Sequence, residues 1–402
     1  MGMKTKFLNK LKYFDYGLFI PFLILALIGI VMVYSASSIN LSYLTGKTMQ
    51  YFIRQSIYVI LGIGLTVLFA QTNPRWWRNP RMLLYGWGFL MLLLGYAKFF
   101  TSAINGANGW INLKVISIQP SEICKLYLVM FLANLFANYT TKGKNVFYKR
   151  MMRKRVTKEL LMLLMVLSML LLIALAPDFG GFGISFAIVV VMYLAYADIN
   201  YKKSTWIIIL GTAFLGIGTY LLQFTTALNN TSLGYIRQRF LAVFDPFQYA
   251  NSSGKQLVNS FYAVSNGGLI GRGLGESIQK RGYLPEPYTD FILSVIAEEL
   301  GVLGAVVVLC LLAWIILRIF LIGIRSKSVY AMYFCYGVGT FIAVETFFNV
   351  GGAIGLLPIT GVTLPFISYG GSSMIVLTVA LGMVMNISAT QKRGLEVEVF
   401  GK

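Results

Sequence analysis

The stretch GYLPEPYTDFILSVIAEELG, residues 282–301, separates a long polar segment from an apolar one. Pro285 and Pro287 favour an extended approach, because proline disfavours helix in the residue before it. Thr289 is then placed to cap a helix through its hydroxyl. Asp290 falls in the first turn, where a carboxylate meets the positive end of the helix dipole. The acidic residues of this stretch are Glu286, Asp290, Glu298 and Glu299. They serve either a reaction or only the solubility of a capped helix at a membrane surface, and this stretch alone leaves both interpretations open.

The composition indicates one polytopic membrane domain over residues 1–402. Apolar residues make up 57% of the chain and charged residues 12%, against roughly 25% charged in soluble proteins. The basic N-terminal segment precedes an apolar run without a convincing cleavage site, so we count that run as the first span. The fold class is therefore an all-α bundle of ten transmembrane helices. We expect them near residues 16–34, 56–70, 82–99, 121–139, 159–176, 182–197, 205–222, 291–317, 329–348 and 372–388.

The basic residues predict the orientation. With the N-terminus inside, most of the 34 Lys and Arg residues fall in cytoplasmic segments, as the positive-inside rule requires. Both termini are then cytoplasmic, including a tail at about 389–402, and the protein lies in the plasma membrane. The net positive charge of the chain, formally +20, also attracts anionic membrane lipids. Nucleic acid is excluded as a partner, because the basic residues lie in short loops beside the membrane and not on a soluble module.

One long extracellular loop, at about 223–290 between helices seven and eight, is expected to form a folded cap. Its positive charges run against the general bias and suggest an anionic ligand, since arginine forks suit phosphate oxygens. The candidate substrate-binding cations are Arg237, Arg239, Arg272, Lys280 and Arg281. The glycine-rich segment NGGLIGRGLG, residues 266–275, either lets backbone amides approach that ligand or forms a tight turn.

Other charges lie in or beside the spans. In QPSEICK, residues 119–125, Glu122 and Lys125 are neighbours on one helix face and line a cavity or form a structural ion pair. PDFGG, residues 177–181, makes an outer turn that places Asp178 at the extracellular surface, although turn chemistry alone would explain it. Glu298 lies about 80° around the helix from Asp290, whereas the adjacent Glu299 lies about 180° away. Of these two glutamates, only Glu298 could share a cavity with Asp290.

The absence of histidine limits the possible chemistry. Carboxylates, lysine, cysteine and tyrosine remain, and the three cysteines lie in apolar stretches typical of core positions. No metal site is indicated. Mg²⁺ or Mn²⁺ bridging diphosphate oxygens would need only one or two carboxylates, so a metal cofactor stays open. The uncharged, glycine-rich segment at 349–373 is expected to be re-entrant or packed against the cap.

Four stretches carry a resemblance to a known family: LPEPYTDFILSVIAEELG, QPSEICK, PDFGG and GLLPITGVTLPFISYGGSS, residues 355–373. Together they resemble the SEDS proteins, the FtsW/RodA/SpoVE group, over essentially the whole chain. The cap and the sequence KRGYLPEPYTDF are more similar to FtsW than to RodA.

The resemblance implies a peptidoglycan glycosyltransferase that polymerises lipid II on the outer face of the plasma membrane. Its implied partners are a class B penicillin-binding protein and other divisome membrane proteins at the division septum; a RodA-like role in elongation is the alternative. Asp290 matches the family's presumed catalytic residue. Glu122, Lys125 and Asp178 match charged positions of the family's motifs.

The residues fit this assignment. A diphosphate is a good leaving group, so the reaction needs a base for the acceptor hydroxyl and cations at the departing phosphates. Without histidine, Asp290 is the best-placed base, and either burial or nearby arginines could dominate its pKa. A lipid II flippase would place its charges near mid-membrane. A scaffold for division proteins, which could use the basic loop at 140–158, is the third reading.

Overall fold

The structure, a computed structural model, describes residues 12–45, 48–101, 109–112, 117–140, 155–196 and 234–400. A two-residue antiparallel hairpin pairs β1 (Ile111–Asn112) with β2 (Ser117–Ile118), with Ile111 opposite Ile118. The helices are α2 (Tyr16–Thr45), α3 (Gln50–Gln71), α4 (Pro80–Phe100), α5 (Pro120–Thr140), α7 (Arg155–Leu175), α8 (Phe179–Tyr196), α10 (Gly234–Phe244), α11 (Lys255–Gly267), α12 (Ile292–Ile324), α13 (Val329–Ala353) and α14 (Gly371–Phe400).

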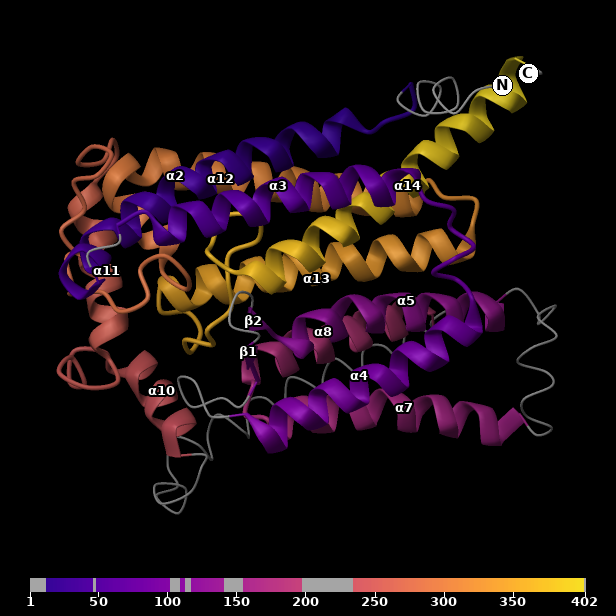
Figure 1. Cartoon of the computed structure of the whole chain (residues 1–402), viewed down its shortest axis with the longest axis horizontal. Coiled ribbons are helices and arrows are strands. Elements are labelled where there is room, and N and C mark those ends of the chain that lie inside the picture. The colour runs from indigo at the N-terminus through magenta and orange to yellow at the C-terminus, as the bar shows by residue number, and fades with distance from the viewer. Residues whose placement is uncertain are drawn as a thin grey trace.

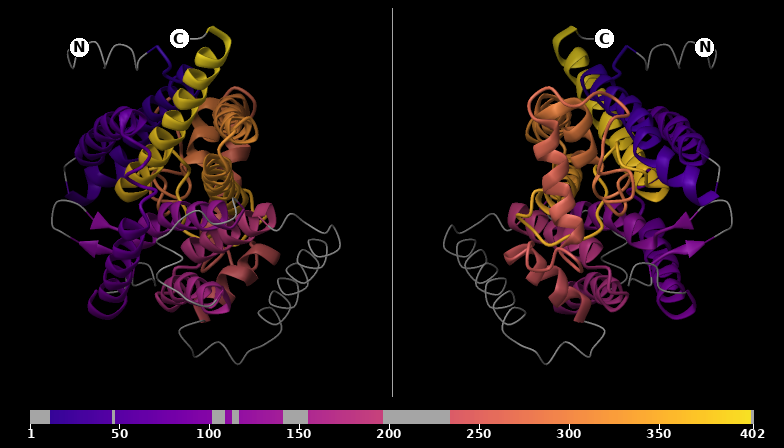
Figure 2. Two further views of the ribbon diagram at one scale, coloured as in Figure 1. Left: turned by 90° about the vertical axis from the view of Figure 1, so that its right-hand side faces the viewer. Right: turned by 90° about the vertical axis from the view of Figure 1, so that its left-hand side faces the viewer.

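The long helices run side by side, and most of them are seen close to end-on in Figure 2. α13 lies at the centre of the bundle, where it packs on α12, α5 and α8, and α14 packs along α3. The start of α2 and the end of α14 lie at one end of the bundle, which we call the terminal face. α10 and α11 lie at the opposite end, which we call the cap face (Figure 1). The two ends of the bundle are therefore formed by different parts of the chain.

Eight of the described helices are long and apolar enough to cross a membrane. They correspond to predicted helices one to four, six and eight to ten, and α7, the fifth, has a shorter apolar part at Leu160–Leu175. The predicted seventh helix at 205–222 lies outside the described residues, as does the start of the predicted cap loop. The multi-pass helical fold is confirmed over the described part of the chain.

Several predicted helix ends were wrong. α3 begins at Gln50 and not at 56, and it therefore includes the polar Gln55, which is buried and donates to the backbone carbonyl of Ile367 at 3.3 Å. α12 continues to Ile324, and α14 continues through the predicted tail as far as Phe400. Hydropathy predicts the apolar part of a helix that lies in the membrane, whereas backbone hydrogen bonds can continue the helix beyond that part.

α12 breaks at Gly301, whose φ of 73° and ψ of 179° are not helical. Segment 266–275 supplies the hydrogen bonds that the break removes. The N–H groups of Val302 and Leu303 donate to the carbonyls of Gly268 and Leu269, at 2.9 and 3.2 Å. The N–H groups of Arg272 and Gly273 donate to the carbonyls of Glu298 and Glu299, each at 3.0 Å.

The glycines of this segment allow two backbones to cross. A Cβ on Gly271 would lie 2.2 Å from the carbonyl oxygen of Glu299, and one on Gly301 would lie 2.2 Å from that of Leu269. The segment makes a turn directly after α11, as one of the two predicted roles describes, and an approach of its amides to a ligand remains a prediction. The close approach is to α12 itself, and it ties the cap to the start of the span.

Candidate functional site

Asp290 lies on the cap face, just before α12. The predicted cap by Thr289 was wrong: α12 begins at Ile292, its N-cap Phe291 makes no side-chain bond, and the Thr289 hydroxyl donates to the Glu286 carboxylate at 3.1 Å. The approach is a series of turns and not the extended segment that its prolines suggested, with Glu286 at a φ of 52°. Asp290 therefore projects from a turn and not from the first turn of a helix.

The loop between α13 and α14 holds the backbone around Asp290. Asn349, near the end of α13, donates its Nδ2 to the carbonyls of Asp290 and Val362, at 2.8 Å each. The Ser368 hydroxyl donates to the carbonyl of Thr289 at 2.6 Å. As predicted, the uncharged glycine-rich loop packs against the cap segment.

A glycine of this loop faces the Asp290 carboxylate. A Cβ built on Gly361 would lie 3.7 Å from Asp290 Oδ2, and the φ of 75° at Gly361 is one that other residues rarely adopt. Two parts of the chain that are far apart in sequence thus meet at Asp290: the turn before α12, and the end of α13 with the loop that follows it. Such fixed surroundings are what a positioned catalytic group requires.

The pKa of Asp290 is raised to about 7. Burial is the largest cause and the neighbouring Glu286 carboxylate adds to it, whereas Arg239 and the hydrogen bond with Thr289 act in the opposite direction. Burial therefore outweighs the arginine, a balance that the sequence left open. A carboxyl group that titrates near neutral pH is suited to accept a proton in a reaction.

Of the five candidate cations in the cap, Arg239 is the one whose charge acts on Asp290. Arg239, on α10, donates its Nη1 to the carbonyl of Ile359 at 2.7 Å, so the α13–α14 loop orients it as well. Arg237 is partly buried on the same helix, and Arg272 is exposed where the glycine segment crosses α12. Arg281 is exposed and lies 3.5 Å from Glu276 in a surface ion pair.

The prediction that Lys280 belongs to this cation cluster was wrong. Its side chain is buried and its ammonium lies 2.7 Å from Glu299 Oε1 and 2.8 Å from the hydroxyl of Ser35, which is on α2. Ser35 donates to the same carboxylate at 2.7 Å. This buried ion pair connects the cap to α2 and α12, so it has a structural role.

Glu298 does not share a cavity with Asp290. Its buried carboxylate accepts bonds from the hydroxyl of Ser277 and from the N–H groups of Ile278 and Gln279, at 3.1 and 3.2 Å. Counting angles around the helix failed because Asp290 is not on the helix. Glu298 anchors the cap segment and has its oxygens already occupied.

A second charged cluster lies within the bundle. Lys125 Nζ lies 2.7 Å from Glu122 Oε2 and 3.1 Å from Glu345 Oε1, so the predicted pair on α5 is joined by a carboxylate of α13. Ser373 interacts electrostatically with Glu345, and its hydroxyl lies 3.0 Å from that of Thr363 in the α13–α14 loop. The cluster is thereby connected to the loop that surrounds Asp290.

Asp178 is the N-cap of α8. Its Oδ1 accepts from the N–H of Gly181 at 2.8 Å, and its Oδ2 accepts from the hydroxyl of Ser121 at 2.6 Å and the amide of Gln119 at 3.1 Å. These contacts fix the start of α5 against α8, as the turn-chemistry explanation predicts.

The sequence reasoning missed Asn349 and Glu345 as site residues. Glu345 could have been found, because a carboxylate within a span needs a partner. Asn349 carries no such signal, since its two acceptors come from other parts of the chain. Among the described residues, no three His, Cys, Asp or Glu side chains come together in an arrangement that could hold a metal ion.

Residues 16–393 match the family described as cell cycle protein, the FtsW, RodA and SpoVE family. Probable peptidoglycan glycosyltransferases FtsW are similar over most of their length. The protein of Lactococcus lactis is 35% identical, with 96% of this chain and 95% of that protein covered. The proteins of Enterococcus hirae and Bacillus subtilis are each 37% identical, with 92% and 94% of this chain and 91% of each relative covered.

Solved structures have the same fold. A chain from a structure described as the structural coordination of polymerization and crosslinking by a peptidoglycan synthase complex aligns with a TM-score of 0.72 and 26% identity. It covers 94% of this chain and 98% of its own length. The rod shape determining protein RodA of Thermus thermophilus aligns with a TM-score of 0.63 and 24% identity, over 93% of this chain and 96% of RodA, and this likeness concerns the fold alone.

Proposed function

The chain belongs to the FtsW, RodA and SpoVE family of cell cycle proteins, and from that membership we propose that it is a peptidoglycan glycosyltransferase with Asp290 as its general base. Its substrate is lipid II, a disaccharide-pentapeptide on a lipid diphosphate. The observation that carries the proposal is a partly buried carboxylate with a pKa of about 7 on the cap face beside Arg239, whose backbone is held by the end of α13 and the loop that follows it.

The reaction follows from this arrangement. Asp290 takes the proton of the acceptor 4-hydroxyl of GlcNAc as that oxygen attacks C1 of MurNAc on the donor. A bond forms between the acceptor oxygen and C1, the bond from C1 to the diphosphate breaks, and the lipid diphosphate leaves with its electron pair. Arg239 lies where it can stabilise the negative charge that develops on the departing phosphates. A divalent ion carried by the diphosphate would be held by Asp290 and Glu286, whose carboxylates interact with each other, and would neutralise charge on the phosphates.

We place the terminal face in the cytoplasm and the cap face outside, at the division septum. The cations of the α3–α4 turn, the α12–α13 turn and the end of α14 all lie at the terminal face, in agreement with the positive-inside rule. A class B penicillin-binding protein is the proposed partner that crosslinks the strands. The similarity to a chain of a peptidoglycan synthase complex and the FtsW relatives support this arrangement.

Purified protein incubated with lipid II, with and without the penicillin-binding protein, tests the activity. We expect glycan strands on a gel. The buried cluster of Glu122, Lys125 and Glu345 is the feature that favours the rival function, a lipid II flippase. Lipid II transfer between the leaflets of proteoliposomes without strand formation would support the flippase and exclude the proposed function.

A further inference from the structure

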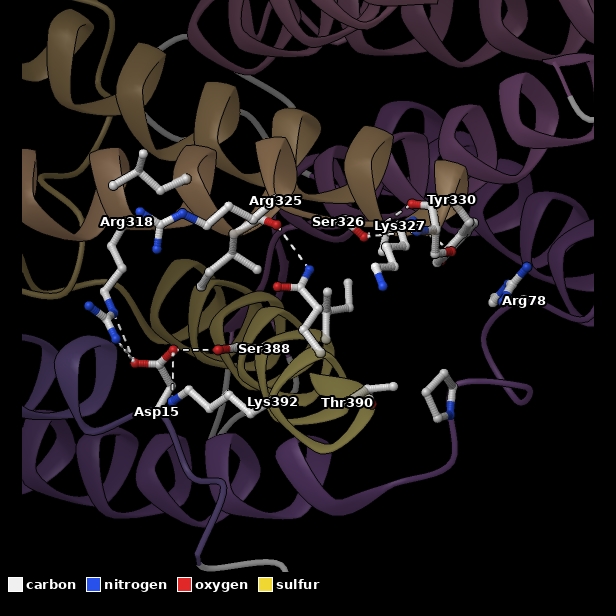
Figure 3. Close-up of a pocket in the computed structure, with 18 of the residues that line it drawn as sticks. Asp15, Arg78, Arg318, Arg325, Ser326, Lys327, Tyr330, Ser388, Thr390 and Lys392 are labelled. Atoms are coloured by element: carbon white, nitrogen blue, oxygen red, sulfur yellow. Dashed lines mark hydrogen bonds and ion pairs between the residues drawn. The ribbon is translucent and has the colours of Figure 1, made fainter. Parts of the chain in front are cut away.

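The terminal face contains a cavity that the proposed reaction does not use. Its volume is about 500 Å³, and four parts of the chain line it: Asp15 just before α2, the turn between α3 and α4, the α12–α13 hairpin around its turn, and α14. Figure 3 shows side chains from these parts surrounding one space. The cavity lies at the end of the bundle opposite Asp290.

The lining of the cavity is strongly basic. It holds one carboxylate, Asp15, and five cations, which leaves a formal excess of four positive charges. The cations are Arg78, Arg318, Arg325, Lys327 and Lys392. A concave space lined by several cations favours an anionic ligand.

The single carboxylate holds the walls together. Arg318 donates its Nε and Nη2 to Asp15 Oδ1, at 2.9 and 2.7 Å, and Ser388 of α14 donates to Oδ2. Burial favours a raised pKa for Asp15, but these hydrogen bonds and the charges of Lys392 and Arg318 hold the pKa below its ordinary value. Asp15 thus stays charged and joins α2, α12 and α14.

Three further contacts fix the other walls. Gln391 of α14 donates its Nε2 to the carbonyl of Ile322 at 2.9 Å, and the guanidinium of Arg78 lies 4.6 Å from the ring centre of Tyr330. Asn134 of α5 donates to the backbone carbonyl of Arg78 at 2.7 Å. The site is therefore formed before a ligand arrives, which lowers the entropic cost of binding.

The cavity is continuous with the apolar surface of a span. Leu321 lines the cavity and is 46% exposed, and Leu317 and Ile324 on the same helix are 62% and 63% exposed. Trp77 also lines it, and tryptophan is enriched at the level of lipid headgroups. A ligand with a phosphate head and acyl tails matches both the basic cavity and the apolar wall beside it.

We propose that this cavity binds the phosphate headgroup of an anionic phospholipid, with the acyl chains lying along the exposed face of α12. The cations of the α3–α4 turn and the α12–α13 turn contact the phosphate, while Arg318 stays paired with Asp15. The site is separate from the reaction centre and does not depend on the proposed function.

Binding is measured on the full-length protein in phosphatidylcholine nanodiscs, by thermal unfolding as phosphatidylglycerol replaces part of the phosphatidylcholine. We expect phosphatidylglycerol to raise the unfolding temperature and inorganic phosphate at the same concentration to leave it unchanged. A cation at the surface of an anionic membrane contributes roughly a fivefold factor in affinity. The double variant Arg78→Ala/Arg325→Ala should therefore bind phosphatidylglycerol about 25-fold more weakly.

The matched control is Arg75→Ala/Arg393→Ala, which removes the same charge from exposed positions on the same face that do not line the cavity. It should retain the phosphatidylglycerol effect. The single variant Arg325→Ala, at an exposed position, separates lost binding from lost packing of Arg78 on Tyr330. An equal loss in cavity and control variants, an equal effect of inorganic phosphate, or no preference for phosphatidylglycerol would each overturn the proposal.

Discussion

Asn349 donates its side-chain Nδ2 to the backbone carbonyl of Asp290 at 2.8 Å, across 59 residues of sequence. The same nitrogen donates to the carbonyl of Val362 at 2.8 Å. One amide on α13 thus fixes both the candidate catalytic residue and the loop that faces it. The position of the carboxylate depends on α13 as much as on its own segment.

Replacing Asn349 should therefore affect both stability and rate. Asn349→Leu leaves two carbonyls without this donor, which should destabilise the protein by roughly 1–3 kcal/mol. A small displacement of the carboxylate should slow strand synthesis by roughly 10–100-fold. Asn259→Leu is the control, because Asn259 donates to the carbonyl of Tyr283 at the surface. Equal effects of the two substitutions would show that the Asn349 bonds do not position Asp290.

The pKa of Asp290 predicts the pH dependence of the reaction. A general base must be deprotonated, so strand synthesis should rise with pH and be half-maximal near pH 7. Glu286→Gln removes a charge that raises this pKa, so its midpoint should move to lower pH. Arg239→Gln removes a charge that lowers it, so its midpoint should move to higher pH, in addition to any loss of maximal rate.

Initial rates of strand synthesis between pH 5 and pH 9 test this pair of shifts. Midpoints that stay unchanged in both variants would contradict Asp290 as the titrating group. The same pKa affects folding: because it is raised above that of the unfolded chain, stability should fall as the pH rises from about 4 to about 7. Asp290→Asn should lack that fall.

The buried ion pair of Lys280 and Glu299 predicts a structural defect and not a substrate defect. Lys280→Met leaves Glu299 buried without its cation, which typically costs about 3–5 kcal/mol. The double variant Lys280→Met/Glu299→Met should recover most of that loss. Arg281→Met changes the neighbouring, exposed cation and should cost less than about 1 kcal/mol. Normal thermal stability of Lys280→Met together with weakened lipid II binding would contradict this structural role and show that Lys280 contacts the substrate.

The three charges within the bundle should act as one unit. Lys125→Met leaves two carboxylates without their shared cation, and a loss of about 3–5 kcal/mol is expected. Adding Glu345→Gln should then destabilise the protein less than it does in the unmodified protein, because Lys125, the ion-pair partner of Glu345, is absent. A double-mutant cycle for Lys125 and Glu345 measures this coupling. Simple additivity of the two effects would contradict a shared ion pair.

The helices could be predicted from the sequence because apolar runs determine membrane spans. The packing of the glycine-rich loop against the cap was also predictable, since irregular uncharged backbone at membrane depth has to be covered by protein. That Glu122 and Lys125 could have a third charged partner was predictable from the sequence. Its identity as Glu345 required the packing of α5 on α13.

The roles of the cap residues could not be predicted, because they depend on the path of the chain. Arg239 and Lys280 look alike in sequence, yet one lies beside Asp290 and the other is buried on Glu299. The position of Glu298 was mispredicted because α12 begins two residues after Asp290. The break at Gly301 was missed because its missing hydrogen bonds are made with a segment about thirty residues earlier.

The central claim is that Asp290 is the base, and Asp290→Asn tests it most directly. The asparagine keeps the size of the side chain but cannot accept a proton at neutral pH. Strand synthesis and lipid II binding are measured on one preparation, with Asn259→Leu alongside. We expect strand synthesis to fall by about 10²–10⁴-fold while lipid II binding and pairing with the transpeptidase persist. Near-normal strand synthesis by Asp290→Asn would contradict the assignment of the catalytic residue.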